Sequence, residues 1–99
     1  MKSVTYARPA RSDLREILKF IARDSRRNGE RFLTRIEAKC QRLADAPELG
    51  NPVPEITGAC YWLVQRYVIV FRRTESGVEV LRVLHSARDW LAEFGNSPE

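Results

Sequence analysis

The side chains that could carry out a reaction lie mostly in the last third of the chain. General acid–base catalysis needs one side chain that accepts a proton, another that donates one, and cations that stabilise the negative charge of the transition state. The residues that could supply these groups are Tyr67, Arg72, Arg82, His85 and Arg88. The segment from Val68 to Leu84 contains no lysine, however, and this absence argues against a catalytic role for these residues. Two other interpretations stay open: His85 and Asp89 form hydrogen bonds that fix the chain where it leaves its last strand, or they contact a macromolecular target.

The sequence carries none of the common catalytic motifs. It has no phosphate-binding glycine loop, no His-Glu-x-x-His and no Gly-x-Ser-x-Gly. One histidine and two separated cysteines do not form a zinc site of the usual kind. Cys40 falls on an apolar helical stripe, which predicts a buried structural thiol, and Cys60 begins a strand, where partial exposure is expected. We therefore expect no metal and no cofactor.

Length and composition predict one soluble domain over residues 1–99. Hydrophobic residues make up 43% and charged residues 30%, which is typical of a globular protein and not of a disordered one. The longest apolar run, Val68 to Phe71, is too short to span a bilayer, and Met1 to Val4 lack the apolar core of a secretory signal. We expect a cytoplasmic protein that does not bind membranes.

The basic residues are concentrated in the first half of the chain. Residues 1–46 hold 12 Lys and Arg against 6 Asp and Glu, a charge of +6, and residues 47–99 hold 5 against 7, a charge of −2. Fourteen of the 17 basic residues are arginines, whose planar guanidinium binds carboxylates and phosphates bidentately. The first half therefore suits an acidic protein segment or a nucleic acid, unless these charges only solvate the surface.

Apolar spacing predicts a strand and two helices in this first half. Residues 2–7 alternate as a strand, and residues 9–24 carry an apolar stripe at i, i+3, i+4 and i+7 that is typical of an amphipathic helix. A second helix is predicted from Asn28, its expected N-cap, to residue 46, because Pro47 ends it. The short link predicts an antiparallel helical hairpin. The first stripe is Leu14, Ile17, Leu18 and Ile21, and the second is Phe32, Leu33, Ile36, Cys40 and Leu43, with Ala44 beside it.

Four basic residues follow one another along the second helix at spacings of four, four and three. They are Arg31, Arg35, Lys39 and Arg42, and together we call them the basic ridge. Residues at these spacings lie on one side of a helix, and this side faces away from the apolar stripe.

The second half of the chain predicts three strands after an irregular segment, residues 47–58, that holds three prolines and two glycines. The strands are 60–65, 66–73 and 78–84, with a glycine-containing hairpin connection at 74–77. Straight alternation in the last strand would place Val78, Val80, Arg82 and Leu84 on one face. The stem of Arg82 is expected to pack there while its head finds a carboxylate or water.

The predicted fold class is α+β, with the order β-α-α-β-β-β. We expect a three- or four-stranded antiparallel sheet packed on the helical hairpin, with strand 2–7 at an edge or beside the last strand. Residues 90–94 are expected to form a short terminal turn.

Four segments give the sequence a resemblance to a known family. Each is weak alone, but they occur in the family's order and spacing and cover nearly the whole chain. They are Ala10-x-x-Asp13-Leu14-x-x-Ile17 with Phe20-Ile21-Ala22; Phe32 to Leu43 with Ala46-Pro47-x-Leu49-Gly50; Arg66-Tyr67-Val68-Ile69-Val70-Phe71-Arg72; and Val83-Leu84-His85-Ser86-Ala87-Arg88-Asp89. On these residues the chain resembles the ParE toxins of the RelE/ParE superfamily, from bacterial type II toxin–antitoxin operons.

The resemblance implies a toxin, and not an enzyme, that inhibits a type II topoisomerase, typically DNA gyrase. Growth arrest and plasmid stabilisation would follow. It also implies neutralisation by the acidic and apolar C-terminal segment of a ParD-like antitoxin, which is a ribbon-helix-helix protein. The toxin would contact operator DNA only through this antitoxin. The candidate target-binding residues are Arg82, His85, Arg88, Asp89, Trp90 and Phe94. The basic ridge is the candidate antitoxin-binding site.

Two alternatives accompany this interpretation. RelE-like members of the superfamily cleave mRNA on the ribosome, and a degenerate toxin would be a binding module without poison activity. Family members often carry an arginine in a Gly-x-Arg pattern before the central strands. Here Cys60 occupies that position, in Gly58-Ala59-Cys60, so one basic contact of the family is missing.

Overall fold

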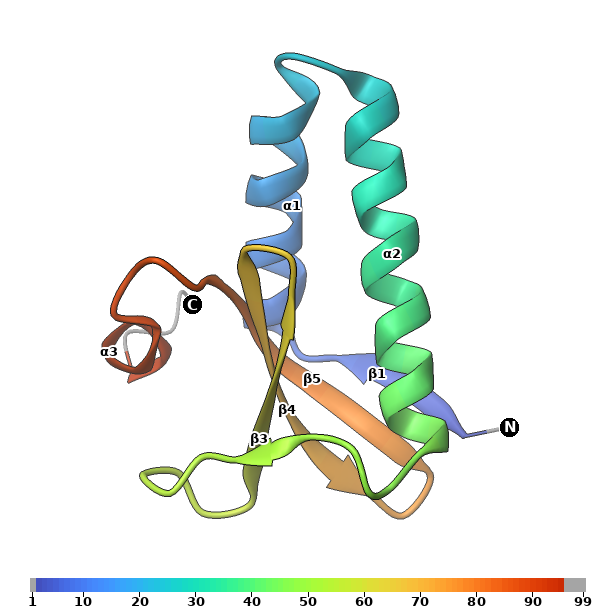
Figure 1. Cartoon of the computed structure of the whole chain (residues 1–99), viewed down its shortest axis with the longest axis vertical. Helices are drawn as coiled ribbons and strands as arrows, with labels where there is room; N and C mark the ends of the chain where they lie inside the picture. Colours follow the sequence, from blue (N-terminus) through green and yellow to red (C-terminus); the bar gives the residue numbers. More distant parts are fainter. Residues whose placement is uncertain (1, 96–99) are drawn as a thin grey trace.

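Two helices cover one face of a five-stranded sheet in the computed structural model, which describes residues 2–95 (Figure 1). The elements are β1 (Ser3–Tyr6), α1 (Arg8–Ala22), α2 (Arg26–Asp45), β2 (Asn51–Pro52), β3 (Ala59–Val64), β4 (Tyr67–Thr74), β5 (Gly77–His85) and α3 (Trp90–Gly95). The α+β class, the order of the predicted elements and the helical hairpin are confirmed.

The two long helices differ from expectation only at their ends. Pro9 stands in the first turn of α1, where its missing N–H leaves no helical bond unmade. The N-cap of α2 is Ser25 and not Asn28: the Ser25 hydroxyl accepts a hydrogen bond from the Asn28 backbone N–H at 3.1 Å. The prediction of Asn28 was wrong because serine three residues earlier already satisfies that N–H. The helix ends before Pro47, as predicted.

The sheet has the order β1-β5-β4-β3-β2, so the first strand lies at an edge beside the last, as predicted. Its strands number five, because Asn51 and Pro52 of the irregular segment pair with β3 as a two-residue strand. The sheet is also not wholly antiparallel, since β1 runs parallel to β5. The helical hairpin accounts for this. It returns the chain to the end of the sheet where β1 starts, with Lys2 bonded to Asp45, and β3, β4 and β5 then alternate from that end.

A register shift in β5 overturns the predicted straight alternation of that strand. Val70 pairs with Arg82 but Phe71 pairs with Val80, so Leu81 is an extra residue. Such a bulge moves the following side chains to the opposite face. Beyond it, Val83 joins Val80 in the core under the helices. Arg82 therefore does not share a face with Val80, as strict alternation had implied.

Two cores lie on opposite faces of the sheet. The larger core packs both helices against β4 and β5, and its fully buried members include Ile36, Cys40 and Phe71. The smaller core lies on the face without long helices, where Val53, Ala59, Val68 and Val70 are buried beneath partly exposed residues of β3 and α3. No helix among the described residues is long and apolar enough to cross a membrane.

An arginine that the sequence analysis did not single out closes the end of α2. The Arg73 guanidinium donates hydrogen bonds to the backbone oxygens of Leu43, Ala46 and Leu49 at 2.8 to 3.1 Å. These carbonyls lie at and beyond the helix C-terminus, where acceptors lack helical partners and a cation is favourable. Arg73 thus ties β4 to the exit of the helical hairpin.

Candidate interaction surfaces

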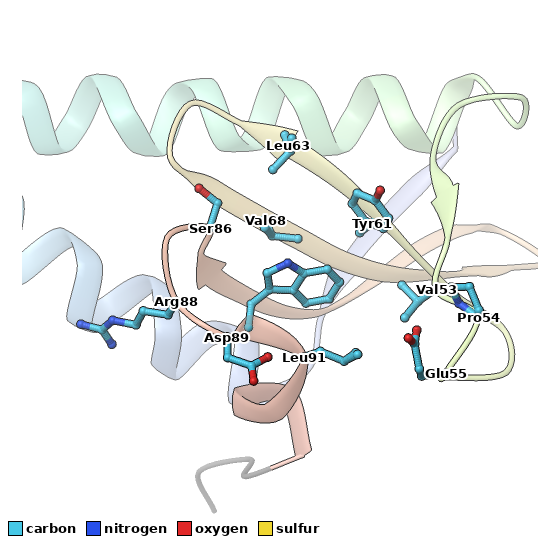
Figure 2. Close-up of a pocket in the computed structure, with 11 residues that line it drawn as sticks. Val53, Pro54, Glu55, Tyr61, Leu63, Val68, Ser86, Arg88, Asp89 and Leu91 are labelled. Atoms are coloured by element: carbon cyan, nitrogen blue, oxygen red, sulfur yellow. The ribbon is translucent and has the colours of Figure 1, made fainter.

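A groove of about 550 Å³ opens on the sheet face that the long helices leave uncovered (Figure 2). It runs between β3 and the chain that leaves β5, with Val68 at its floor (Figure 2). We call it the sheet-face groove. Its lining residues are Val53, Pro54, Glu55, Tyr61, Leu63, Val68, Ser86, Arg88, Asp89, Trp90 and Leu91.

The wall opposite β3 is the short helix α3, whose start is built by local contacts. The Asp89 carboxylate accepts a hydrogen bond from the Ala92 backbone N–H at 3.3 Å, as an N-cap does. The Trp90 ring lies against Tyr61 with ring centroids 5.5 Å apart. Arg88 is exposed and forms a 3.3 Å ion pair with Glu93. Three candidate target-binding residues, Arg88, Asp89 and Trp90, therefore lie together at this groove.

Phe94 stands apart from those three. It is partly buried against the smaller core and does not line the groove.

Arg82 lies inside the protein, where it joins α1, β5 and α3. Its guanidinium binds the Asp13 carboxylate bidentately at 2.7 and 2.9 Å and donates to the Glu93 backbone oxygen at 3.0 Å. The side chains of Arg82 and Asp13 are only 6% and 11% exposed. The sequence analysis expected the Arg82 head to find a carboxylate, and it does. Because it is buried, Arg82 can affect a target surface only through the position of α3.

Asp13 also completes the edge of β5. The first strand ends at Tyr6, opposite Val80, so β1 does not reach Val83. The Asp13 carboxylate accepts the Val83 N–H at 2.9 Å in place of a strand carbonyl. One carboxylate thus satisfies a backbone donor and a buried guanidinium, which accounts for the family-like Ala10-x-x-Asp13-Leu14 segment in physical terms.

His85 takes part in the contacts that close the last strand. Its Nδ1 accepts a hydrogen bond from the Ala87 backbone N–H at 3.1 Å, and the Ser86 N–H donates to the Arg66 oxygen at 2.7 Å. The His85 ring packs edge-on against Tyr67, which packs edge-on against Phe32 of α2. These contacts agree with the interpretation of His85 as part of a hydrogen-bonded closure of the strand exit.

The side chains that could serve a ribonuclease are not gathered at one place. Tyr67 and His85 adjoin each other, packed toward α2, and neither lines the sheet-face groove. Arg72 is paired with Glu79 at 2.7 Å. Arg82 is buried, and of the set only Arg88 lines the groove.

The basic ridge is fully on the surface, and its first half borders a second hollow. All four of its residues are exposed. Arg31 and Arg35 line a hollow of about 330 Å³ together with Ile21, Phe32 and Gln65. Gln65 occupies the β3–β4 turn with a φ of 55°. The hollow thus combines apolar side chains with two cations beside the end of β3.

The two cysteines lie as predicted. Cys40 is fully buried, and burial raises the pKa of its thiol to about 11, so it remains protonated at neutral pH. Cys60 is half-buried on β3. No cluster of three or more His, Cys, Asp or Glu residues that could hold a metal ion occurs within residues 2–95.

The comparison with protein families decides what this arrangement is. The family described as ParE toxin of type II toxin-antitoxin system, parDE, matches residues 4–90. The chain belongs to the ParE toxin family. It is therefore a toxin of a type II toxin–antitoxin system, and such a system includes an antitoxin partner. A search of curated proteins gives no match. The matched residues run from Val4 in β1 through the helical hairpin and β2 to β5, and end at Trp90 in the groove wall.

Proposed function

We propose that this ParE-family toxin poisons DNA gyrase by binding it through the sheet-face groove. The observation that carries the proposal is the apolar surface left open there. Leu63 is 57% exposed at the groove, beside the half-buried Tyr61, Trp90 and Leu91. An exposed apolar patch with a polar rim is typical of a protein interaction site. Here Arg88, Asp89 and Glu55 supply the rim.

The same surface supports binding over RNA cleavage. The groove contains no histidine and no lysine, and its titratable side chains are Glu55, Tyr61, Arg88 and Asp89. Cleavage would need a base and an acid placed on either side of one phosphate. The residues with suitable chemistry, Tyr67 and His85, are packed against each other toward α2. We therefore propose a toxin without enzymatic activity of its own.

We further propose that a ParD-like antitoxin neutralises the toxin at the basic ridge. An acidic and apolar segment would place its apolar side chains in the hollow beside Ile21 and Phe32 and its carboxylates near Arg31 and Arg35. The adjoining strand β3 pairs with β2 only at Cys60 and Tyr61. An extended segment could therefore continue from the hollow along the sheet edge.

A supercoiling assay with purified gyrase tests the target. The toxin should inhibit supercoiling or yield cleaved DNA, and Trp90→Ala should weaken this effect at least tenfold because it removes a large ring from the groove wall. Phe20→Ala is the matched control: Phe20 is an aromatic residue of α1, 65% exposed and outside the groove. It should leave the effect unchanged. Site-specific mRNA cuts on ribosomes with normal supercoiling would contradict the proposal and favour RelE-like cleavage.

Induction of the toxin without its antitoxin separates an active toxin from a degenerate one. We expect growth arrest with DNA damage signalling and filamentation. Unaffected growth at a confirmed level of folded protein would favour a binding module that has lost its activity, in line with Cys60 at the family's usual arginine position.

Association kinetics with the antitoxin test the basic ridge. Exposed ion pairs contribute only about 0–1 kcal/mol each, so reversing Arg31 and Arg35 to Glu should slow association more than it weakens final affinity. The salt dependence of the rate should also flatten. The matched control is Arg8→Glu with Arg15→Glu on α1, which makes the same change in charge. Equal effects of both variants would place the antitoxin elsewhere.

A further inference from the structure

A second row of cations runs along the outer side of α1, separate from the basic ridge. Its members recur at spacings of three, four, four and four. They are Arg8, Arg11, Arg15, Lys19 and Arg23, all exposed, and we call them the α1 stripe. From Arg8 to Arg23 the helix rises about 22 Å. The apolar side of the same helix, with Leu14 in the core, points toward the sheet.

Contacts within the protein leave most of this charge unused. Arg8, Arg15 and Arg23 form no side-chain hydrogen bond or ion pair among residues 2–95. Lys19 lies 3.9 Å from Glu16, but both side chains are about 70% exposed, so this pair is weak. Arg11 donates to the Tyr6 backbone oxygen at 3.3 Å.

The first turn of α1 also places charge where it disfavours the helix. Arg8 and Arg11 lie at the N-terminal end, which carries the positive pole of the helix dipole, and no acidic residue stands in the first turn. The N-cap, Ala7, forms no side-chain cap. Helix stability therefore does not account for cations at these positions.

We propose that the α1 stripe binds the phosphate backbone of duplex DNA, without sequence preference. Over about 22 Å, one strand of a duplex presents about six phosphates. Four of the five cations are arginines, which bind phosphates bidentately.

The composition of the stripe favours a duplex over other partners. It carries no aromatic side chain, whereas proteins that bind single strands stack bases on aromatic rings. It carries no apolar anchor, which an acidic protein segment would use for affinity. Phe20, which is exposed, lies three residues before Arg23 and therefore borders only the C-terminal end of the stripe, away from its other arginines.

The inference goes beyond the proposed function, because it needs neither a topoisomerase nor an antitoxin. It would replace the expectation that DNA meets this toxin only through the antitoxin. It also offers the toxin a means to reach a topoisomerase that is already engaged on DNA, since backbone binding allows sliding along a duplex.

Fluorescence anisotropy of a labelled 30-base-pair duplex of arbitrary sequence tests the proposal with the full-length chain. If each of the four arginines contacts one phosphate, the plot of log association constant against log salt concentration has a slope of about −3.6. Affinity should therefore fall about a hundredfold between 50 and 200 mM NaCl. Arg8→Glu with Arg15→Glu should reduce this slope by about two and weaken binding at least tenfold at 50 mM. The matched control, Arg31→Glu with Arg35→Glu, changes the charge equally on α2 and should bind nearly as the unaltered protein does.

The α1 variant is expected to fold, because an acidic residue at position 8 interacts favourably with the positive end of the helix dipole. Circular dichroism should show an unchanged helix content. Three results would overturn the proposal: no duplex binding at 50 mM salt, a loss of binding in the α2 variant equal to that in the α1 variant, or tighter binding of double-stranded RNA or poly-glutamate than of duplex DNA. None of these bears on gyrase inhibition, so the two proposals fail separately.

Discussion

The two faces of the sheet differ in how completely they are covered. On the helix-covered face, Ile36, Cys40 and Phe71 have no exposed surface at all. On the other face, the short helix α3 covers only part of the apolar surface, and Leu63 remains 57% exposed. The uncovered apolar surface carries an energetic cost in water that a partner could remove. The closed face therefore supplies the stability of the domain, and the open face supplies its candidate target site.

One ion pair connects these faces. Arg82 lies between Asp13 of α1, which belongs to the helical layer, and the Glu93 backbone oxygen of α3, which forms the groove wall. Because the pair is almost wholly buried, packing and hydrogen bonds fix its geometry, and salt screens the attraction between its two charges only weakly. The position of α3 at the sheet-face groove thus depends on a buried contact between Arg82 and the helix α1.

Breaking that pair should have the largest effect on stability. Asp13→Ala leaves the Arg82 guanidinium buried without its carboxylate and the Val83 N–H without an acceptor. We expect the free energy of unfolding to fall by about 3–5 kcal/mol, measured by urea denaturation. Asp13→Leu combined with Arg82→Met removes both charges and should recover much of the loss. A loss below about 1 kcal/mol for Asp13→Ala would show that the pair is accessible to water.

A matched pair of truncations sharpens the comparison of the faces. Ile36→Ala on the closed face should cost about 2–5 kcal/mol, because the buried site cannot refill the cavity. Leu91→Ala removes the same number of methylene and methyl carbons from the groove wall, where the side chain is half-exposed, and should cost about 1 kcal/mol or less. Denaturation midpoints of both variants provide the measurement. Equal losses would mean that the two faces are equally packed.

The sequence predicted the closed face better than the open one. Helical spacing found the stripe from Leu14 to Leu43 because burial imposes a period that is visible in the residue types. The bulge at Leu81 was not predicted, because apolar residues occur on both faces of this strand and only the pairing with β4 reveals the shift. The parallel pairing of β1 also depends on topology, which local patterns do not contain.

The candidate site was predictable only in part. Arg88, Asp89 and Trp90 adjoin in sequence and so remain together in the groove. The opposite wall, Tyr61 and Leu63, belongs to a strand that reaches α3 only through folding. The roles of Asp13 and Arg73 were missed because their partners lie at least 24 residues away in the chain. One available signal was the position of Asp13 within the family-like segment of the first helix.

The last stability effect appears only at high pH and concerns the thiol at the centre of the closed face. The pKa of Cys40 is about 11 in the folded protein, against an ordinary value of 9.0, because burial disfavours the thiolate. The folded state therefore keeps its proton where the unfolded state has lost it. The free energy of unfolding should fall as pH rises from about 9 to about 11, by about 2 kcal/mol from this group.

Cys40→Ala removes this contribution. It also reduces the rise in the pKa of the neighbouring Tyr6, which is caused chiefly by burial and further by Cys40 itself. The variant should be less stable at neutral pH, owing to the lost sulfur contacts, but its stability should decline less between pH 9 and pH 11. Iodoacetamide should label Cys60 in the native protein and leave Cys40 unmodified, since only the former is partly exposed. Parallel pH curves for the two proteins, or rapid alkylation of Cys40, would mean that solvent reaches the closed face. The helix-covered face would then be less completely buried than the structure indicates, and the two faces would differ only in the exposed apolar residues of the groove.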